Sequence, residues 1–363
     1  MSNKSKELDF KSLVDPSLWK DYETFIRSAD KRLEEDIKKS INKRKELRKI
    51  LLEDPQLKQR IRPRKEESDR WDSLLKWAED ELFSGNVAAV DGTISNFSMV
   101  SGTRCRIGVI STSYKNKRIE KVLYVSEREL AEPSSSVIEH FEKLRKKHRI
   151  SALLLRALML YGERQIALSR SEAWKLVHGE LLPYELRTGL GIYRALPESL
   201  ELGRKLIEAK NVIAVIEDTT RLNLLNAGII LERGEYMEAL TLKEYFENNY
   251  LPTAHFSRDD EALFKEFVKD YCDNVRIGVY RVGFKPYVFE AHKDVFDKAA
   301  ALIMKDAENQ PMRGFPLLID YADAICSCLL SGSDFQRQIM FKTAKASPDT
   351  FGFEMIARTT RRR

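Results

Sequence analysis

The chain has 363 residues, of which 33% are charged, and its formal net charge is +6. This length allows a sizeable core and is long for one domain, and the mild positive charge permits a nucleic-acid partner without requiring one. The four cysteines lack zinc or disulfide spacing, the N-terminus lacks a secretory signal, and the apolar run 150–160 is too short to span a membrane, so we expect a cytoplasmic protein with buried, reduced thiols.

Residues 1–84 are predicted to form a charged helical N-terminal region. Residues 22–52 combine dense charge with apolar residues spaced by three or four, which is typical of a long, thinly amphipathic helix. Pro55 ends this helix, and a second basic helical run over 58–64 leads to an apolar face that begins at Trp71. We expect these helices to pack on the body of the protein or on a second subunit, with a nucleic-acid clamp as the alternative.

An apolar, β-branched run follows, and it stops abruptly at Asp91 and Gly92. The run 87–90 between two glycines predicts a buried strand that a tight turn closes at Gly92, with the Asp91 carboxylate at its end. A carboxylate in this position either binds a metal ion or caps its own turn, since Asp-Gly is ordinary turn chemistry.

The next elements are two strands and a long helix. Residues 104–111 and 120–125 are predicted to complete an antiparallel meander. A helix over 137–168 follows, with a possible break near residue 150, and its second half is apolar on nearly all sides. Glu163 lies in this half and needs a partner there, which is either a functional one or Arg156 in a structural ion pair.

The remaining chain alternates between strands and helices. We predict strands at 173–177 and 212–216 in a parallel crossover, a β-hairpin of 276–283 and 287–291, and helices at 197–210, 221–232, 242–249, 293–306 and 317–330.

A meander, a helix and then alternating strands and helices is the order of the ribonuclease H-like fold. Within it, four short stretches resemble motifs of the NurA nuclease family, the DNA-end-processing partner of the HerA hexameric ATPase. They are VAAVDGT at 87–93, LMLYGERQIAL at 158–168, LVHGELLP at 176–183 and GFPLLIDYAD at 314–323. The resemblance implies an α/β fold with a ribonuclease H-like mixed sheet, an antiparallel meander plus parallel strands, flanked by helices. The nuclease domain is expected over 85–335, and a C-terminal extension with a basic tail over 336–363.

The same resemblance implies a metal-dependent DNA nuclease whose catalytic residues are Asp91, Glu163, His178 and Asp323, with Glu180 as a further metal ligand. Two Mn²⁺ or Mg²⁺ ions are expected, because a pair of divalent ions activates water and neutralises the charge on the phosphoryl group. The family has an aspartate where this chain has His178, and imidazole favours Mn²⁺ over Mg²⁺. A catalytically impaired NurA-like subunit that binds DNA or assembles a complex is therefore the alternative.

Each candidate also has a structural interpretation: Asp91 as a turn cap, His178 as a core histidine and Asp323 as a surface residue. A ribonuclease H-like RNA-processing enzyme would keep the same site with another substrate. The resemblance further implies a homodimer, a HerA-like ATPase partner, and a role in DNA repair or phage defence. Basic and aromatic residues are expected to contact the phosphate backbone or stack on a strand end, namely Arg104, Lys115, Lys117, Arg118, Tyr184 and Arg187.

Overall fold

The chain divides into two compact units, Met1–Lys58 and Gln59–Arg363. The computed structural model describes residues 22–63, 67–99, 102–115, 117–126, 137–189, 195–217, 224, 228, 230–251, 257–330, 332–346 and 348. The basic tail and most of the predicted helix 221–232 lie outside these residues.

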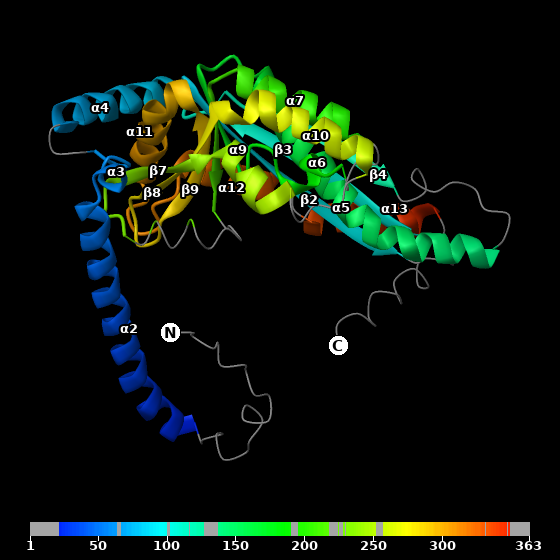
Figure 1. Ribbon diagram of the computed structural model, residues 1–363. Helices are drawn as coiled ribbons and strands as arrows, with labels where there is room; N and C mark the ends of the chain where they lie inside the picture. The colour runs from blue at the N-terminus through cyan, green and yellow to red at the C-terminus, as the bar shows by residue number, and fades with distance from the viewer. Residues whose placement is uncertain are drawn as a thin grey trace. The chain divides into compact units, whose positions relative to one another are not determined.

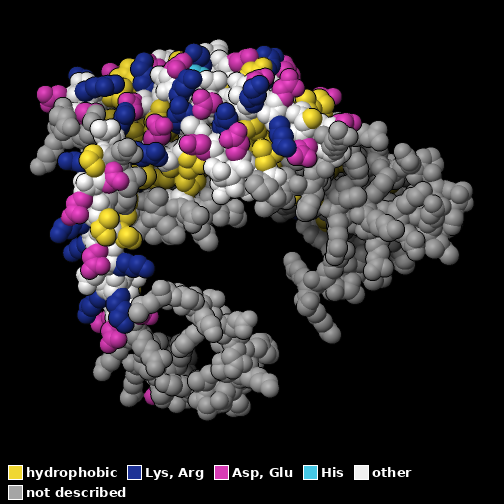
Figure 2. Space-filling model, viewed as in Figure 1, with side chains coloured by type: hydrophobic (Ala, Val, Ile, Leu, Met, Phe, Trp, Pro, Cys, Tyr) yellow, Lys and Arg dark blue, Asp and Glu magenta, His cyan; other side chains and the backbone are white. Residues whose placement is uncertain are grey.

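The first unit is dominated by one long helix. Helix α2 (Tyr22–Glu53) ends just before Pro55, as predicted, and the single turn α3 (Pro55–Lys58) follows it. Apolar side chains of α2, among them Leu33, Ile37 and Ile41, are exposed between charged ones (Figure 2). The helix therefore presents a thin apolar stripe to solvent, as expected from its composition.

Nine strands among the described residues of the second unit form one mixed sheet, in the order β1-β7-β8-β9-β6-β5-β2-β3-β4 (Figure 1). Strands β2, β3 and β4 make the predicted antiparallel meander, β5 pairs parallel to β2, and β6 pairs parallel to β5. This half of the sheet has the strand order and directions of the ribonuclease H-like fold, so the predicted fold class is confirmed. Strands β9, β8, β7 and β1 extend the sheet with antiparallel pairs.

The strands are β1 (Ile61–Arg62), β2 (Val87–Met99), β3 (Gly102–Thr112), β4 (Ile119–Ser126), β5 (Trp174–His178), β6 (Val212–Ile216), β7 (Glu235–Thr241), β8 (Val275–Arg281) and β9 (Tyr287–His292). The α-helices of the second unit are α4 (Ser68–Ser84), α5 (Val137–Ser169), α6 (Tyr184–Arg187), α7 (Leu196–Glu208), α9 (Leu242–Tyr245), α10 (Arg258–Tyr271), α11 (Phe296–Ala307), α12 (Leu317–Leu329) and α13 (Gly332–Ala346). The part of the chain that the structure describes also contains the π-helix η4 (Phe246–Tyr250) and the 3-10 turns η6 (Cys272–Asn274) and η7 (Lys293–Val295).

Local sequence signals explain several element ends. Helix α4 ends where Gly85 adopts φ 79°, a left-handed conformation that glycine reaches without strain. Helix α9 begins with a capping box between Thr241 and Glu244, and the Ser257 hydroxyl accepts the Asp260 N–H at the start of α10.

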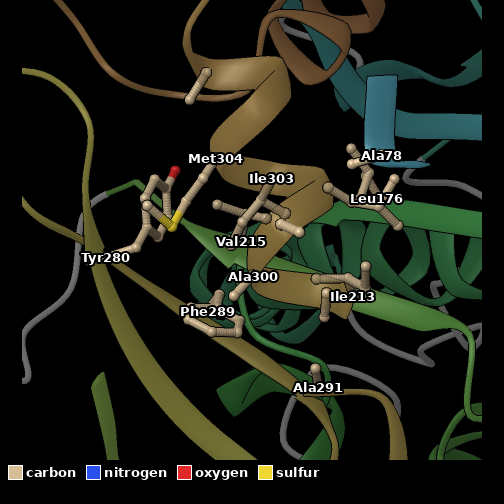
Figure 3. Packing of buried hydrophobic residues seen from close by; sticks show 14 of the residues in the cluster. Ala78, Leu176, Ile213, Val215, Tyr280, Phe289, Ala291, Ala300, Ile303 and Met304 are labelled. Carbon is tan, nitrogen blue, oxygen red and sulfur yellow. The ribbon is translucent and has the colours of Figure 1, made fainter. Parts of the chain in front are cut away.

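Helices cover both faces of the sheet. Helices α4, α11 and α12 pack on one face, and α4 and α11 lie side by side (Figure 1). The opposite face of β2, β3 and β5 is covered by α5, which also contacts α6 and α7. On the first face, side chains of four neighbouring strands pack against Ala300, Ile303 and Met304 of α11 (Figure 3). The strand residues include Leu176 of β5, Ile213 and Val215 of β6, Tyr280 of β8, and Phe289 and Ala291 of β9.

Several expectations about elements were wrong or incomplete. Strand β2 does not turn at Gly92, because its pairing with β3 continues to Met99 and satisfies the backbone better than an isolated Asp-Gly turn. Part of the predicted helical run 58–64 is instead the edge strand β1, in which Ile61 pairs with Met237. Helix α5 is unbroken at residue 150, and strand β7 and helix α10 were not predicted.

The start of α12 depends on a close backbone contact between Gly283 and Gly314. Gly314 has φ 76°, and a Cβ there would lie 2.2 Å from the Gly283 nitrogen. We therefore expect Gly314→Ala to lower the free energy of unfolding by about 2 kcal/mol or more, through backbone strain and steric overlap. Gly234→Ala is the matched control, because Gly234 has φ 83° and a Cβ there would meet no atom of the described residues within 4 Å. Urea denaturation measures both, and equal losses would contradict the role of the contact.

Candidate functional site

Three neighbouring strands bring polar side chains to one end of the sheet. Ala89 of β2 is paired with Leu176 of β5, and Leu176 with Ile213 of β6, all on the face that α11 and α12 cover. Side chains two residues further along a strand return to the same face. The next positions on this face of β2 and β5 are Asp91 and His178, whose Oδ1 and Nδ1 atoms lie 3.3 Å apart.

Helix α12 adds a second carboxylate to this end. Asp323 is exposed, and its carboxyl lies close enough to Asp91, which is only 5% exposed, for the two negative charges to repel each other. The Ser327 hydroxyl contacts Asp323 Oδ1 at 3.4 Å. The site is therefore closed on the side of Asp91 and open to solvent on the side of Asp323.

Glu163 enters from α5, which lies on the opposite face of the sheet. A Cβ at Gly92 would lie 2.6 Å from Glu163 Oε1, so only a glycine leaves room for this carboxylate beside β2. A glycine is therefore needed at position 92 for space beside Glu163, and not for the turn that the sequence predicted. It lets a helix on the far face place a carboxylate near Asp91.

Arg164 is fully buried and organises this part of the site. It pairs with Glu163, and its Nη2 donates to the carbonyl oxygens of His178, at 2.9 Å, and of Glu180. One guanidinium therefore neutralises a buried acid and holds the loop that follows β5. Arg156, the predicted structural partner of Glu163, instead pairs with Glu185 at 2.7 Å.

The charges of the cluster shift its proton affinities. Burial raises the pKa of Glu163 to about 7, against the attraction of Arg164 and with a contribution from Asp91. Burial and the adjacent Asp91 carboxylate also raise the pKa of Asp323. Burial alone would lower the pKa of His178, but Asp91, Glu163 and Glu217 together raise it. The cluster thus holds more negative charge than its cations balance, and it takes up protons in compensation.

Glu217 is a member of the site that the sequence analysis missed. It directly follows β6, and its Oε2 lies 3.7 Å from His178 Nε2. It also pairs with Arg313, which binds Asp320 at 2.6 Å and lies over the Phe315 ring. The signal was the same as for Asp91, an acid at the end of a fully apolar strand.

The sequence analysis expected Glu180 to be a further metal ligand beside Asp91, but the structure directs its side chain elsewhere. Its carboxylate pairs with Arg187, whose guanidinium lies over the rings of Tyr184, Phe246 and Tyr250. Arg187 is buried, so this contact ties the loop after β5 to α6 and η4. Tyr184 is exposed and lies on the same short helix.

The remaining predicted nucleic-acid residues do not form one path. Arg104 lies near the start of β3, whereas Lys115, Lys117 and Arg118 follow its end at Thr112, which is eight residues or about 26 Å further along the strand. Arg118 pairs with Glu120 at 2.6 Å. On the face shown in Figure 2, basic side chains of the described residues are interspersed with acidic ones.

The side chains at this site suit a divalent cation in their chemistry. Carboxylate oxygens and an imidazole nitrogen are ligands of Mn²⁺ and, for the oxygens, of Mg²⁺. Asp91 and Asp323 form the kind of repulsive carboxylate pair that a cation relieves. Among the described residues, no three His, Cys, Asp or Glu side chains are already arranged as a metal site. Binding would therefore require these side chains to reorient.

The cysteines take no part in the site. Burial and the nearby carboxylates raise the pKa of Cys326 to about 12, so its thiol stays protonated beside the Asp91 carbonyl. All four cysteines are free, and Cys328 is exposed, contrary to the expectation of four buried thiols. Within the described part of the chain, no helix has the length and apolar character needed to cross a membrane.

Comparison with known proteins gave matches only among solved structures, since no family model and no curated protein matches the chain. The NurA nuclease from Sulfolobus solfataricus is similar at a TM-score of 0.47 and 12% identity, covering 77% of this chain and 95% of that one. A NurA structure with manganese is similar at a TM-score of 0.47 and 11% identity, and the match covers 78% of this chain and 98% of that one. Endonuclease V from Bacillus subtilis has a TM-score of 0.35 and 13% identity, covering 76% and 95%. The NurA structures belong to the family that the four sequence motifs resemble.

The raised pKa of Glu163 makes stability depend on pH. Between the ordinary value of 4.5 and about 7, the folded chain binds more protons at this carboxyl than the unfolded chain does, so the free energy of unfolding falls as the pH rises. In metal-free buffer, we expect Glu163→Gln to reduce the total decrease in the free energy of unfolding over this pH range by at most about 3 kcal/mol. Urea denaturation between pH 4.5 and 7.5 measures the slope. Glu266→Gln, at an exposed position on α10, should keep the wild-type slope, and an unchanged slope in Glu163→Gln would contradict the assignment.

Proposed function

We propose that this chain is a metal-dependent nuclease that hydrolyses phosphodiester bonds of DNA. The main support is the cluster at the end of the parallel strands, where Asp91 lies 3.3 Å from His178 and repels the carboxylates of Asp323 and Glu163. Neighbouring acids that repel one another cost stability, and clusters of this kind are typical of functional sites, where a divalent cation can relieve the repulsion.

Different residues of the cluster would bind the cation and the phosphate. Asp91, Asp323 and Glu163 would hold the cation, with His178 as a fourth ligand. When bound, divalent ions lower the pKa of water and neutralise developing charge on a phosphoryl group. Asp323 and His178 face solvent, so a phosphodiester can approach on their side. Arg313, which is 41% exposed beside Glu217, offers a guanidinium to a phosphate oxygen at the same opening.

The substrate and the partners follow from the sequence resemblance. DNA as the substrate, a homodimer, and a HerA-like ATPase partner in DNA repair or phage defence stay predictions from the sequence resemblance. RNA is the alternative substrate, and parallel assays on both polymers separate the two.

A catalytically impaired subunit is the second candidate function. Two features favour it, the imidazole of His178 in place of an expected carboxylate and the pairing of Glu163 with Arg164. Both reduce the negative charge available to hard cations. Such a subunit would bind DNA or a partner without cleaving it.

The first test compares cleavage of labelled single-stranded and double-stranded DNA with Mn²⁺ and with Mg²⁺. We expect Asp91→Asn and Asp323→Asn each to reduce the rate at least about a hundredfold, because each removes a ligand charge. Asp259→Asn, at an exposed position of α10, is the control and should retain wild-type activity. Folding is checked by circular dichroism, and DNA binding without cleavage by wild-type protein under all conditions would establish the impaired subunit instead.

A second test uses the chemistry of residue 178. His178→Asp replaces an imidazole by a carboxylate, the harder ligand, and should increase the ratio of Mg²⁺-supported to Mn²⁺-supported cleavage by about tenfold. His178→Asn, which has a similar size but no charge, should lower both rates without shifting this ratio. The idea that residue 178 contacts the cation fails if His178→Asp leaves the ratio unchanged.

A further inference from the structure

A recess separate from the candidate active site lies between the edge of the meander and helix α13. It has a volume of about 510 Å³, and its lining includes Arg104 and Arg106 of β3, Tyr124 of β4, and Phe335, Gln338 and Lys342 of α13. This volume is within the range of pockets that hold small organic molecules, so it suits one or two nucleotides.

The chemistry of the recess favours an anionic ligand with flat rings. Arg104, Arg106 and Lys342 are cationic, and none of the described residues that line it is acidic. The Arg106 guanidinium lies 5.0 Å from the centre of the Phe335 ring. The Tyr124 ring meets Phe335 edge-on and is 51% exposed, so part of its surface is open for stacking.

The recess shares a sheet face with the candidate active site. Ile110, which pairs with Asp91, packs against Cys326 of α12. Arg106 and Arg104 are four and six residues from Ile110 and therefore return to this face. Arg106 pairs with Ser95, which lies four residues beyond Asp91 on β2, or about 13 Å along the strand.

The last turn of α12 lies between the two places. The Ser95 hydroxyl donates to the Leu330 carbonyl at 2.8 Å, and Leu330 packs beside Ile110. The recess therefore lies on the same sheet face as Asp91, on the other side of this turn. A single nucleic-acid strand has the matching features, a charged backbone and bases that stack on aromatic rings.

We propose that this recess binds a single nucleic-acid strand outside the cleavage site, with a base stacked on Tyr124 and phosphates beside Arg104 and Lys342. The inference rests on the proposed nuclease function for the origin of the strand. It adds a subsite that binds substrate without taking part in hydrolysis. An acidic polypeptide is the competing ligand, because it shares the charge but lacks stacking bases.

The test measures binding of a fluorescent 20-nucleotide oligothymidine to the full chain in EDTA, where cleavage is absent. Tyr124→Leu should weaken binding about 5- to 100-fold through loss of stacking, and Tyr124→Phe should retain the wild-type affinity. Lys342→Gln should reduce the slope of log affinity against log salt by about 0.7, the value for one phosphate contact. Lys345→Gln, on the same helix but outside the recess, should leave the slope unchanged.

Three results would overturn the inference: no binding by the wild-type chain, unchanged affinity in Tyr124→Leu with the wild-type circular dichroism spectrum, or displacement of the oligonucleotide by polyglutamate as effectively as by unlabelled oligothymidine. The nuclease proposal is decided separately, by hydrolysis of bis(p-nitrophenyl) phosphate with Mn²⁺. A chain that binds as predicted but hydrolyses no diester keeps the subsite and loses the nuclease. A chain that hydrolyses but binds without Tyr124 keeps the nuclease and loses the subsite.

Discussion

The parallel register of β2, β5 and β6 is the constraint on which the site depends. Apolar side chains of Ala89, Leu176 and Ile213 must face α11 and α12 to form the core, and this requirement fixes the pairing of the three strands. Asp91 and His178 follow on the same face, so their proximity is a consequence of core packing. A shift of one residue in β5 would turn His178 to the opposite face, where α5 packs.

The strand register also determines which charged side chains lie close together. Arg164 compensates Glu163 and binds two carbonyl groups, which fixes the loop after β5. No guanidinium compensates Asp91 and Asp323 in the same way among the described residues, and burial together with the Asp91 charge raises the pKa of Asp323. The proposed cation site is therefore the part of the cluster where the protein's own charges leave the largest excess.

Helix α12 connects this cluster to its surroundings. The contact between Gly283 and Gly314 sets its start, and Asp306 accepts the N–H of Leu318 at 2.8 Å in its first turn. Its end meets β2 through Ser95, and α13 then forms one wall of the recess. One helix thus places Asp323 beside Asp91 and leads to the proposed strand-binding subsite.

The sequence by itself determined the meander, the parallel strands and most helices, because apolar periodicity and glycine or proline boundaries are local properties. It also singled out Asp91, Glu163, His178 and Asp323 as candidates, and these side chains lie near one another in the structure. Only the tertiary structure decided the partners: Arg164 instead of Arg156 for Glu163, Arg187 for Glu180, and Glu217 beside His178. It also made Gly92 part of a continuous strand. Ion pairs and strand register depend on which distant segments meet in space, and no local pattern contains that information.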